Sequence, residues 1–389
     1  DELVVVGEAD VDVDTHRYTD LLRESSSDLS VHETSRDDLA LMAYTSGTTG
    51  RPKGTVHTHR QLLATCDSYA RYCLDPGPGD VFSGNPPIAF AYGYGILVSF
   101  PLRFGARSVL IEDPDPGDLL AAVDDHGVTI MGSVPTAYNQ MLAEYDPDTD
   151  FDLSSLRLLT SGGEVLPVQT YQDVSEQFGV EITDGMGTTE LLHIFISHRP
   201  EDDFDPTATG FPVPGYECAV LDPETGDEVP RGEPGLLAVR GPTGIQYWNR
   251  PQAQAEAVRD GWNLTGDVFV HRADGRFVYK SRRDDLINTA GYTVPGPEVE
   301  VVLEERAEVY EAAVVSSPGE ERNEIVKAFV VPTEGVSPSE ELTADLQAYV
   351  KDQIAPYKYP REIEYLDTLP KTETGKKRRA SLREREYET

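Results

Sequence analysis

Apolar residues in the first half of the chain recur with two alternating spacings, one typical of strands and the other of helices. Between residues 57 and 74 they recur at helical spacing, at Leu62, Leu63, Cys66, Tyr69, Ala70 and Cys73. Short apolar runs elsewhere are bounded by glycine, proline and acidic residues, which is typical of strands. We therefore predict strands at 3–6, 39–44, 107–112, 128–135, 156–164 and 180–187, and helices at 57–74, 117–127, 136–145 and 168–178.

This alternation predicts an α/β fold with a doubly wound, mostly parallel sheet. After residue 200, Pro/Gly turns separate short apolar runs such as 217–222 and 236–240, which predicts a small β subdomain. Past residues 281–286 the pattern becomes α+β, with helices at 297–306 and 340–353, strands at 311–316, 326–331 and 362–366, and a basic, turn-rich end. We therefore predict a large N-terminal domain over 1–283 and a small C-terminal domain over 284–389.

Three glycine-rich segments, at 46–54, 161–163 and 185–187, each end or follow a predicted strand. Ligands of doubly wound sheets bind at the carboxyl ends of the strands, so these loops are expected to converge. In the first loop, glycines allow successive backbone N–H groups to face one anion, and Lys53 adds a positive charge. The loop predicts a polyphosphate site without the spacing of a Walker A motif. A solvated surface loop is the structural alternative.

The chain is strongly acidic, with 69 acidic against 33 basic residues and a formal charge of −36. The acidic residues are dispersed and there are only eight lysines, which is typical of proteins from organisms adapted to high salt, where a hydrated anionic surface keeps proteins soluble. Such a surface repels phosphate backbones and argues against nucleic acid as a partner.

Cysteine and apolar content bear on the compartment. Cys66, Cys73 and Cys218 form neither an even disulfide framework nor a metal-binding spacing, so we expect a reducing cytoplasm. The longest apolar stretch, residues 89–102, is too short to span a bilayer. The chain does not begin with methionine, so a removed signal peptide and a missing upstream segment both stay open as explanations.

The first glycine loop, "YTSGTTGRPKG" at 44–54, resembles the phosphate-loop signature of the adenylate-forming superfamily. This superfamily includes acyl- and aryl-CoA synthetases, peptide-synthetase adenylation domains and beetle luciferases. The resemblance implies that ATP phosphates are held by Thr45, Ser46, Gly47, Thr48, Thr49, Gly50 and Lys53. "GMGTTE" at 185–190 resembles the second nucleotide motif, which implies that Thr189 contacts phosphate and that Glu190 is the Mg²⁺ ligand.

Further motifs of the superfamily follow in order along nearly the whole chain. "SGGE" at 161–164 resembles the loop beside adenine, and the two nucleotide motifs together imply contacts from Gly162, Gly163, Glu164, Asp184, Gly185, Met186, Gly187 and Thr188. "GWNLTGD" at 261–267 implies that Asp267 binds the ribose hydroxyls, and "SRRDD" at 281–285 implies a ribose contact at Arg282 and a hinge at Asp284. "LPKTETGKKRR" at 369–379 implies that Lys376 is catalytic. Each residue alone has a structural explanation, but the occurrence of all these motifs in order favours the functional one.

A further motif, "PPIAFAYGYG" at 86–95, resembles the segment that shapes the acyl pocket. Together with 187–197 and "GPTGIQYWNRP" at 241–251 it is most like benzoate- and 2-aminobenzoate-CoA ligases, which implies a substrate pocket of Phe90, Ala91, Tyr92, Gly93 and His193. Glycines 93 and 95 are expected to let the backbone approach a flat acid between aromatic rings. His193 either hydrogen-bonds a ring substituent or satisfies a core carbonyl.

The chain departs from the superfamily pattern at three places. Met186 stands where an aromatic residue often stacks on adenine, and Ser281 stands where glycine is usual. Only 43 residues precede the phosphate loop, whereas relatives carry a longer N-terminal portion. We therefore expect a fragment, or a gene product shortened at its start, with an incomplete N-terminal domain.

The resemblance implies a two-step ligase that uses ATP, Mg²⁺ and coenzyme A. An acyl or aryl adenylate would form first, and the C-terminal domain would then rotate about Asp284, withdrawing Lys376 and bringing in the loop around Gly291 before the thiol attacks. A short- or medium-chain acyl-CoA synthetase, an adenylation enzyme that loads a carrier protein and an inactive nucleotide-binding fragment are the alternatives. The number of subunits stays open, with a homodimer as one assembly.

Overall fold

The computed structural model describes residues 3–6, 15–45, 53–146, 151–200, 202–290, 292–319, 324–371 and 377–387. The chain divides into two compact units, residues 1–38 and 39–389. The first unit contains strands β1 (Leu3–Val5) and β2 (Thr15–Arg17), which pair in parallel, and helix α1 (Tyr18–Glu24). The second unit contains everything that the sequence analysis connects with function.

A seven-stranded sheet forms the centre of the second unit, with the order β11-β10-β9-β8-β7-β5-β6. Its parallel part consists of β5 (Val81–Gly84), β6 (Arg107–Ser108), β7 (Ile130–Ser133), β8 (Leu158–Gly162) and β9 (Ile182–Gly187). Strands β10 (Ile194–Ser197) and β11 (Phe211–Pro212) extend it antiparallel. The predicted doubly wound, mostly parallel sheet is confirmed.

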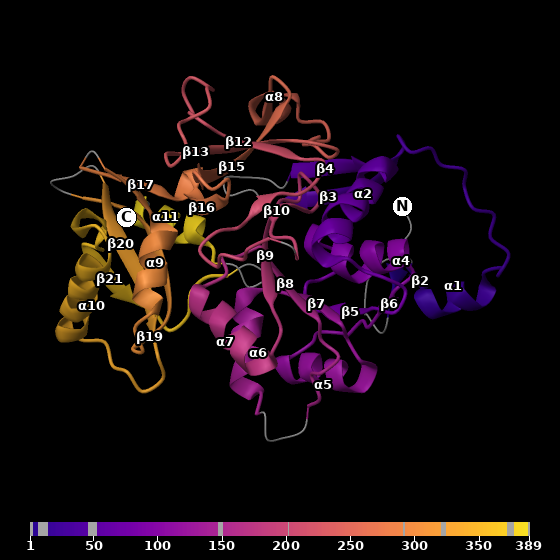
Figure 1. The fold of residues 1–389 in the computed structure, drawn as a ribbon, viewed down its shortest axis with the longest axis horizontal. Coiled ribbons are helices and arrows are strands. Elements are labelled where there is room, and N and C mark those ends of the chain that lie inside the picture. Colours follow the sequence, from indigo (N-terminus) through magenta and orange to yellow (C-terminus); the bar gives the residue numbers. More distant parts are fainter. Residues whose placement is uncertain are drawn as a thin grey trace. The chain divides into compact units, whose positions relative to one another are not determined.

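Both faces of this sheet are covered, which explains why its strands are apolar at consecutive positions. Val81, Met131 and Leu159 pack beneath helices α5 (Pro116–His126), α6 (Pro135–Glu144) and α7 (Val168–Phe178). Their neighbours Phe82, Ile130 and Leu158 point the other way. That face is covered by the helical segment Cys66–Leu74, which continues α2 (His59–Thr65), and by the segment that runs from α3 (Ala91–Tyr94) to α4 (Phe100–Phe104). Figure 1 shows α4 and α5 on opposite sides of β5.

The segment around the first glycine loop differs from the prediction. Strand β3 (Leu39–Thr45) pairs antiparallel with β4 (Lys53–Thr58) in a separate two-stranded sheet and does not join the parallel one. The helix predicted to start at residue 57 therefore starts at His59, where Thr58 and Gln61 form a capping box. The hydrophobic pattern does not predict strand β4, because the buried positions of this strand include the polar residues Thr55 and His57.

A second sheet confirms the predicted β subdomain. It contains β12 (Glu217–Leu221), β13 (Pro234–Arg240), β15 (Trp262–His271), β14 (Val258–Arg259) and β16 (Phe277–Arg282), next to the short helix α8 (Pro251–Ala257). Since β15 and β16 pair antiparallel with Asp267 opposite Arg282, two residues fifteen positions apart meet on one ladder.

The C-terminal part has the predicted α+β character. A hairpin of β17 (Leu286–Thr289) and β18 (Tyr292–Pro295) precedes α9 (Gly296–Glu304), and β19 (Val309–Pro318), β20 (Glu324–Pro332) and β21 (Glu362–Tyr365) form a sheet with α10 (Glu340–Gln353). The chain end, expected to be turn-rich, contains helix α11 (Arg379–Tyr387). A domain boundary at 283/284 stays a prediction. None of the helices in the described part of the chain has the length and apolar character needed to cross a bilayer.

A buried ionic network joins α11 to α9. Arg379 donates two hydrogen bonds to the buried Glu300 carboxylate, at 2.7 and 2.6 Å, and Lys377 lies 3.4 Å from the same group. Burial alone would raise the pKa of Glu300, but the charges of Arg379 and Lys377 bring that pKa below its ordinary value.

We predict that Glu300→Gln lowers the free energy of unfolding by about 3 kcal/mol at pH 7, because a buried guanidinium loses its partner. Glu300 has a lowered pKa in the folded state, so its contribution is complete above its ordinary pKa and disappears as the pH falls through the folded one. Urea denaturation at several pH values measures this. Glu217→Gln, which breaks the exposed ion pair with Arg240, should cost less than about 1 kcal/mol. Equal losses for both variants would contradict the prediction.

Candidate functional site

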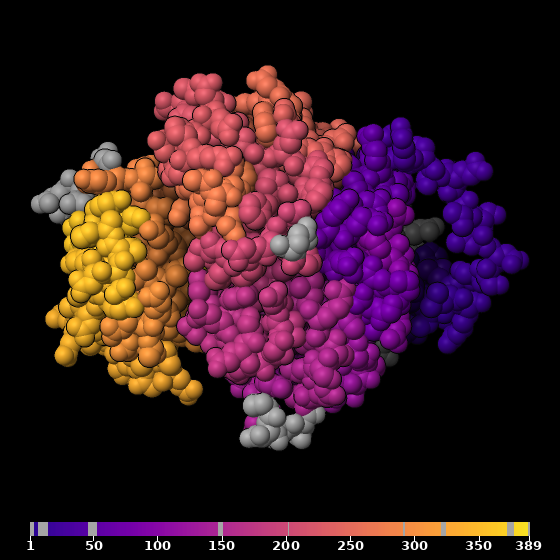
Figure 2. Space-filling view, in the orientation of Figure 1, coloured from indigo at the N-terminus to yellow at the C-terminus, as the bar shows by residue number. Residues whose placement is uncertain are grey.

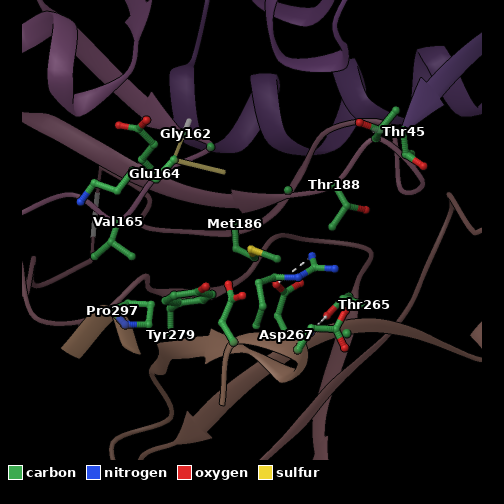
Figure 3. A pocket seen from close by; sticks show the side chains of 18 of the residues that line it. Thr45, Gly162, Glu164, Val165, Met186, Thr188, Thr265, Asp267, Tyr279 and Pro297 are labelled. Atoms are coloured by element: carbon green, nitrogen blue, oxygen red, sulfur yellow. Dashed lines mark hydrogen bonds and ion pairs between the residues drawn. The ribbon is translucent and has the colours of Figure 1, made fainter. Parts of the chain in front are cut away.

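One cleft of about 2870 Å³ receives residues from nearly every motif singled out in the sequence. Its walls come from β4, from the ends of β8 and β9, from β15 and β16 of the β subdomain, and from α9 and α11. In Figure 2 the orange and yellow C-terminal residues lie beside the magenta residues of the sheet region, and the cleft runs between these parts. Figure 3 shows the cleft from close by, with Thr45, Glu164, Met186 and Asp267 around it.

Some predicted site residues lie outside the described part of the chain. These are Ser46, Gly47, Thr48, Thr49 and Gly50 of the first loop, Gly291, and Lys376. The residues that flank two of these gaps are described and pair with each other: Thr45 with Lys53 across the β3–β4 hairpin, and Lys371 with Lys377 across a single bridge. Thr45, Lys53, Lys371 and Lys377 all line the cleft.

Glu190 and Thr189 lie on the loop after β9, where two contacts fix them. The buried His57 of β4 donates a hydrogen bond from Nε2 to the carbonyl of Thr189 at 3.0 Å. Burial lowers the pKa of His57, so the ring is neutral and Nε2 carries the proton. Glu190 Oε1 accepts a hydrogen bond from the Tyr247 hydroxyl at 3.0 Å. The predicted phosphate and metal residues are therefore held beside strand β4.

Asp267 and Arg282 form an ion pair at 3.1 Å in the cleft. Burial raises the pKa of Asp267, although Arg282 opposes the shift. The other carboxylate oxygen, Oδ2, is buried and has no hydrogen-bond partner among the described residues. A buried acceptor without a partner is costly, so this oxygen is suited to receive a donor from a ligand, such as a ribose hydroxyl.

We predict that Asp267→Asn raises KM for ATP about 30-fold, because an amide offers one acceptor oxygen where a carboxylate offers two. Since the pKa of Asp267 is raised, kcat/KM for ATP in the unaltered protein should fall toward acid pH starting above the ordinary range of an aspartate. Initial rates against ATP concentration between pH 5 and 8 measure both. An unchanged KM in the variant would remove Asp267 from the nucleotide site.

The part of the cleft expected to hold adenine is lined by Gly162, Gly163, Glu164, Asp184, Gly185, Met186, Gly187 and Thr188. In Figure 3 the Met186 side chain points toward the wall formed by Tyr279 and Asp267. Tyr279 thus supplies an aromatic ring beside Met186, which occupies the position where an aromatic residue often stacks on adenine. Burial raises the pKa of Asp184 to about 7, and its Oδ1 has no hydrogen-bond partner among the described residues.

Aromatic residues gather at the cleft wall formed by the 86–95 motif. The His193 ring lies 5.6 Å from Tyr92, 5.1 Å from Tyr69 and 4.6 Å from Phe100 between ring centres. His193 is buried and lines the cleft, and neither ring nitrogen has a hydrogen-bond partner among the described residues. Burial lowers the pKa of His193 to about 3, so the ring is neutral. The backbone of Tyr92 opposes part of this shift, so both roles of His193, toward a ring substituent and toward a core carbonyl, stay predictions.

The glycines of this motif pack against protein. A Cβ at position 93 would lie 2.3 Å from the carbonyl oxygen of Pro87, and one at position 95 would lie 2.3 Å from Nε2 of His193. Phe90, Ala91 and Tyr92 line the cleft, whereas Gly93 is absent from its described lining. Gly95 therefore leaves room for the His193 ring, and a place for Gly93 in the substrate pocket stays a prediction.

Three residues around the site were missed from the sequence: Tyr247 and Tyr279, which line the cleft, and the buried His57, which contacts Thr189. Tyr279 could have been found, because it precedes Arg282 by three positions on the strand that carries the hinge motif. His57 carries no local signal and Tyr247 none beyond its place in the segment 241–251, since their partners are 132 and 57 positions away. Asp284 lines the cleft at the end of β16, and its role as a hinge stays a prediction.

Comparison with known proteins gives consistent matches. The AMP-binding enzyme family matches residues 2–248, and the AMP-binding enzyme C-terminal domain matches residues 298–376. A benzoate–CoA ligase from Thauera aromatica is 40% identical over 385 residues, which are 98% of this chain and 72% of that protein.

Two solved structures share the fold. The anthranilate CoA ligase AuaEII in complex with anthranoyl-AMP matches with a TM-score of 0.90 and 34% identity, over 99% of this chain and 74% of that one. A benzoate CoA ligase from Burkholderia xenovorans LB400 matches with a TM-score of 0.84 and 37% identity, over 95% of this chain and 74% of that one. The expected similarity to benzoate- and 2-aminobenzoate-CoA ligases is confirmed.

Proposed function

This chain belongs to the AMP-binding enzyme family, and we propose that it is an ATP-dependent acid–CoA ligase that activates an aromatic carboxylate such as benzoate or 2-aminobenzoate. Its substrates are the acid, MgATP and coenzyme A. The two relatives of known structure act on benzoate and anthranilate by their names, and the aromatic wall of the cleft suits such flat acids.

The environment of His193 is the observation that supports an aromatic acid as the substrate. A neutral imidazole with two unpartnered nitrogens lies among Tyr69, Tyr92 and Phe100 at the cleft wall. Aromatic rings beside a polar group are suited to a ring that carries a polar substituent, because the rings supply stacking area and the imidazole supplies a hydrogen bond. A fatty acid carries no ring to stack there and no ring substituent to pair with the imidazole.

In the first step, an oxygen of the acid attacks the α-phosphorus of ATP, and the bond to the departing pyrophosphate breaks. Catalysis by this chain is positioning and neutralisation of charge. Lys376 contacts the acid and α-phosphate oxygens, Asp267 and Arg282 hold the ribose, and the loop from Ser46 to Lys53 holds the pyrophosphate.

Mg²⁺ enters with ATP, and the described residues fit this arrangement. They contain no group of three or more metal-ligating side chains, and Glu190 supplies one carboxylate to the cleft. Magnesium is often held by one or two carboxylates together with substrate phosphates. The ion would neutralise phosphate charge there.

In the second step, the thiol of coenzyme A attacks the adenylate carbonyl and AMP leaves. We assign this step to a rotation of the domain 284–389 about Asp284, which removes Lys376 and brings the loop around Gly291 to the cleft. A hinged domain allows one pocket to serve two reactions in turn. A cytoplasmic location and a homodimer belong to the same proposal.

A pyrophosphate-release assay in high KCl, with benzoate, 2-aminobenzoate, phenylacetate and short fatty acids, tests the proposal. Release that depends on benzoate or 2-aminobenzoate, followed by thioester formation on adding coenzyme A, is expected. Faster release with fatty acids would favour a general acyl-CoA synthetase. Transfer to a carrier-protein thiol but not to coenzyme A would favour an adenylation module, and no release with any acid would leave only nucleotide binding.

A further inference from the structure

We propose that Tyr247 is a positioning residue that holds the metal ligand Glu190 and the phosphate-binding Lys53 in place for MgATP. This inference rests on the proposed function, and it assigns a role to one residue of the segment 241–251, for which the resemblance implied no individual role. Tyr247 lines the cleft together with both of these residues.

The hydroxyl of Tyr247 fixes the carboxylate. It donates to Glu190 Oε1 at 3.0 Å, which leaves Oε2 as the oxygen for a cation. An ionised carboxylate can only accept hydrogen bonds, so the phenol hydroxyl is the donor in this contact. A hydrogen bond to one oxygen of a metal-binding carboxylate restricts its rotation, and such outer contacts strengthen metal binding.

The ring of Tyr247 orients the lysine. Lys53 Nζ lies 4.7 Å from the ring centre, a distance at which a cation is attracted to an aromatic face. This contact holds a flexible side chain over the cleft before a phosphate is present. Among the eight lysines of the chain, Lys53 is the one at the end of the first glycine loop.

The backbone around Tyr247 is fixed on both sides. Its N–H donates to Gln254 Oε1 at 2.8 Å, and Tyr247 forms a β-bridge with Thr55 of β4. Neighbouring bonds extend this pairing, from Val56 N to the Gln246 carbonyl at 2.9 Å and from Trp248 N to the Gly54 carbonyl at 2.8 Å. Residues 246–248 therefore lie along the strand that begins with Lys53, so the distance from Tyr247 to Lys53 is built into the fold.

The two contacts can be separated by two substitutions. Tyr247→Phe removes the hydroxyl and keeps the ring, whereas Tyr247→Leu removes both. Trp248→Phe is the matched control, because Trp248 is half exposed and its bond to Gly54 comes from the backbone.

The readout is the dissociation constant for ATP, measured by titration calorimetry on the full chain with EDTA or with Mg²⁺. For Tyr247→Phe we expect ATP binding in EDTA within about twofold of the unaltered protein and a roughly tenfold weaker binding of MgATP. For Tyr247→Leu we expect an additional loss of about fivefold in EDTA, since the lysine contact is gone. Trp248→Phe should leave both constants unchanged.

A double-mutant cycle identifies the partner of the hydroxyl. In a Glu190→Gln background, Tyr247→Phe should change MgATP binding by less than about twofold, because the charged partner is already absent. Equal losses in EDTA and in Mg²⁺, or full additivity with Glu190→Gln, would overturn the proposal. A failure of the proposed function would look different from a failure of the Tyr247 proposal. In that case the unaltered protein would bind MgATP but release no pyrophosphate with any acid.

Discussion

Replacing Lys376 with alanine is expected to slow adenylate formation about a thousandfold, the scale of losing a charge-stabilising donor from an active site. Thioester formation from a supplied aryl adenylate should stay within about threefold of the unaltered rate, because Lys376 would be withdrawn from the cleft in that step. The two half-reactions are measured separately, by pyrophosphate release and by thioester formation from synthetic adenylate.

The neighbouring lysines are not expected to replace Lys376. Lys377 Nζ lies 2.6 Å from Glu304 and 3.4 Å from Glu300, and Lys371 lies 2.7 Å from Glu311. Each of these ammonium groups is thus neutralised by carboxylates of α9 or β19. Lys351→Ala, on the exposed side of α10, is a control that should leave both rates unchanged. Equal losses of both half-reactions in Lys376→Ala would reject its assignment.

Replacing Glu190 with glutamine is expected to lower kcat for pyrophosphate release about a hundredfold and to raise the Mg²⁺ concentration for half-maximal rate. The amide oxygen can still accept the hydrogen bond from Tyr247, so the fold around the cleft should persist while the negative charge is lost. Rates at saturating acid and ATP, with Mg²⁺ varied, measure the effect.

Glu256→Gln provides a control for general loss of negative charge at the cleft. Glu256 lines the same cleft from the exposed helix α8, and it accepts a hydrogen bond from Gln252 at 3.1 Å. Its replacement should not alter the Mg²⁺ dependence. If Glu190→Gln shows the same Mg²⁺ dependence as the unaltered protein, Glu190 is not the metal ligand.

The parts of the fold that follow from the sequence are those with local signals. Strands β7 and β8 each begin with two consecutive apolar residues that pack into different cores, and the pattern located β7, β8 and β9 within about two residues. Strand β4 was missed, because its buried residues include a threonine and a histidine whose partners lie on other segments. Helix α11 was missed because its buried contacts are mainly ionic.

The site shows the same limit. Lys53, Glu190 and Asp267, which the ordered motifs single out, line one cleft. Each of these residues follows or belongs to a strand of a sheet with a recognisable pattern. Tyr247 depends on the pairing of residues 246–248 with β4, nearly two hundred positions earlier in the chain. Such pairing is decided by the tertiary fold, and no local periodicity reports it.

Helix α11 also determines how far the chain could be shortened without harm. Arg379 and Arg383 are partners of the buried acids Glu300 and Asp285, and Glu386 binds Lys327 with two hydrogen bonds of 2.9 Å. A protease cut just before Arg379 would thus strip the counter-charges from groups at the centre of the C-terminal part. The chain end that looks basic and turn-rich in the sequence is therefore required for the integrity of the C-terminal part.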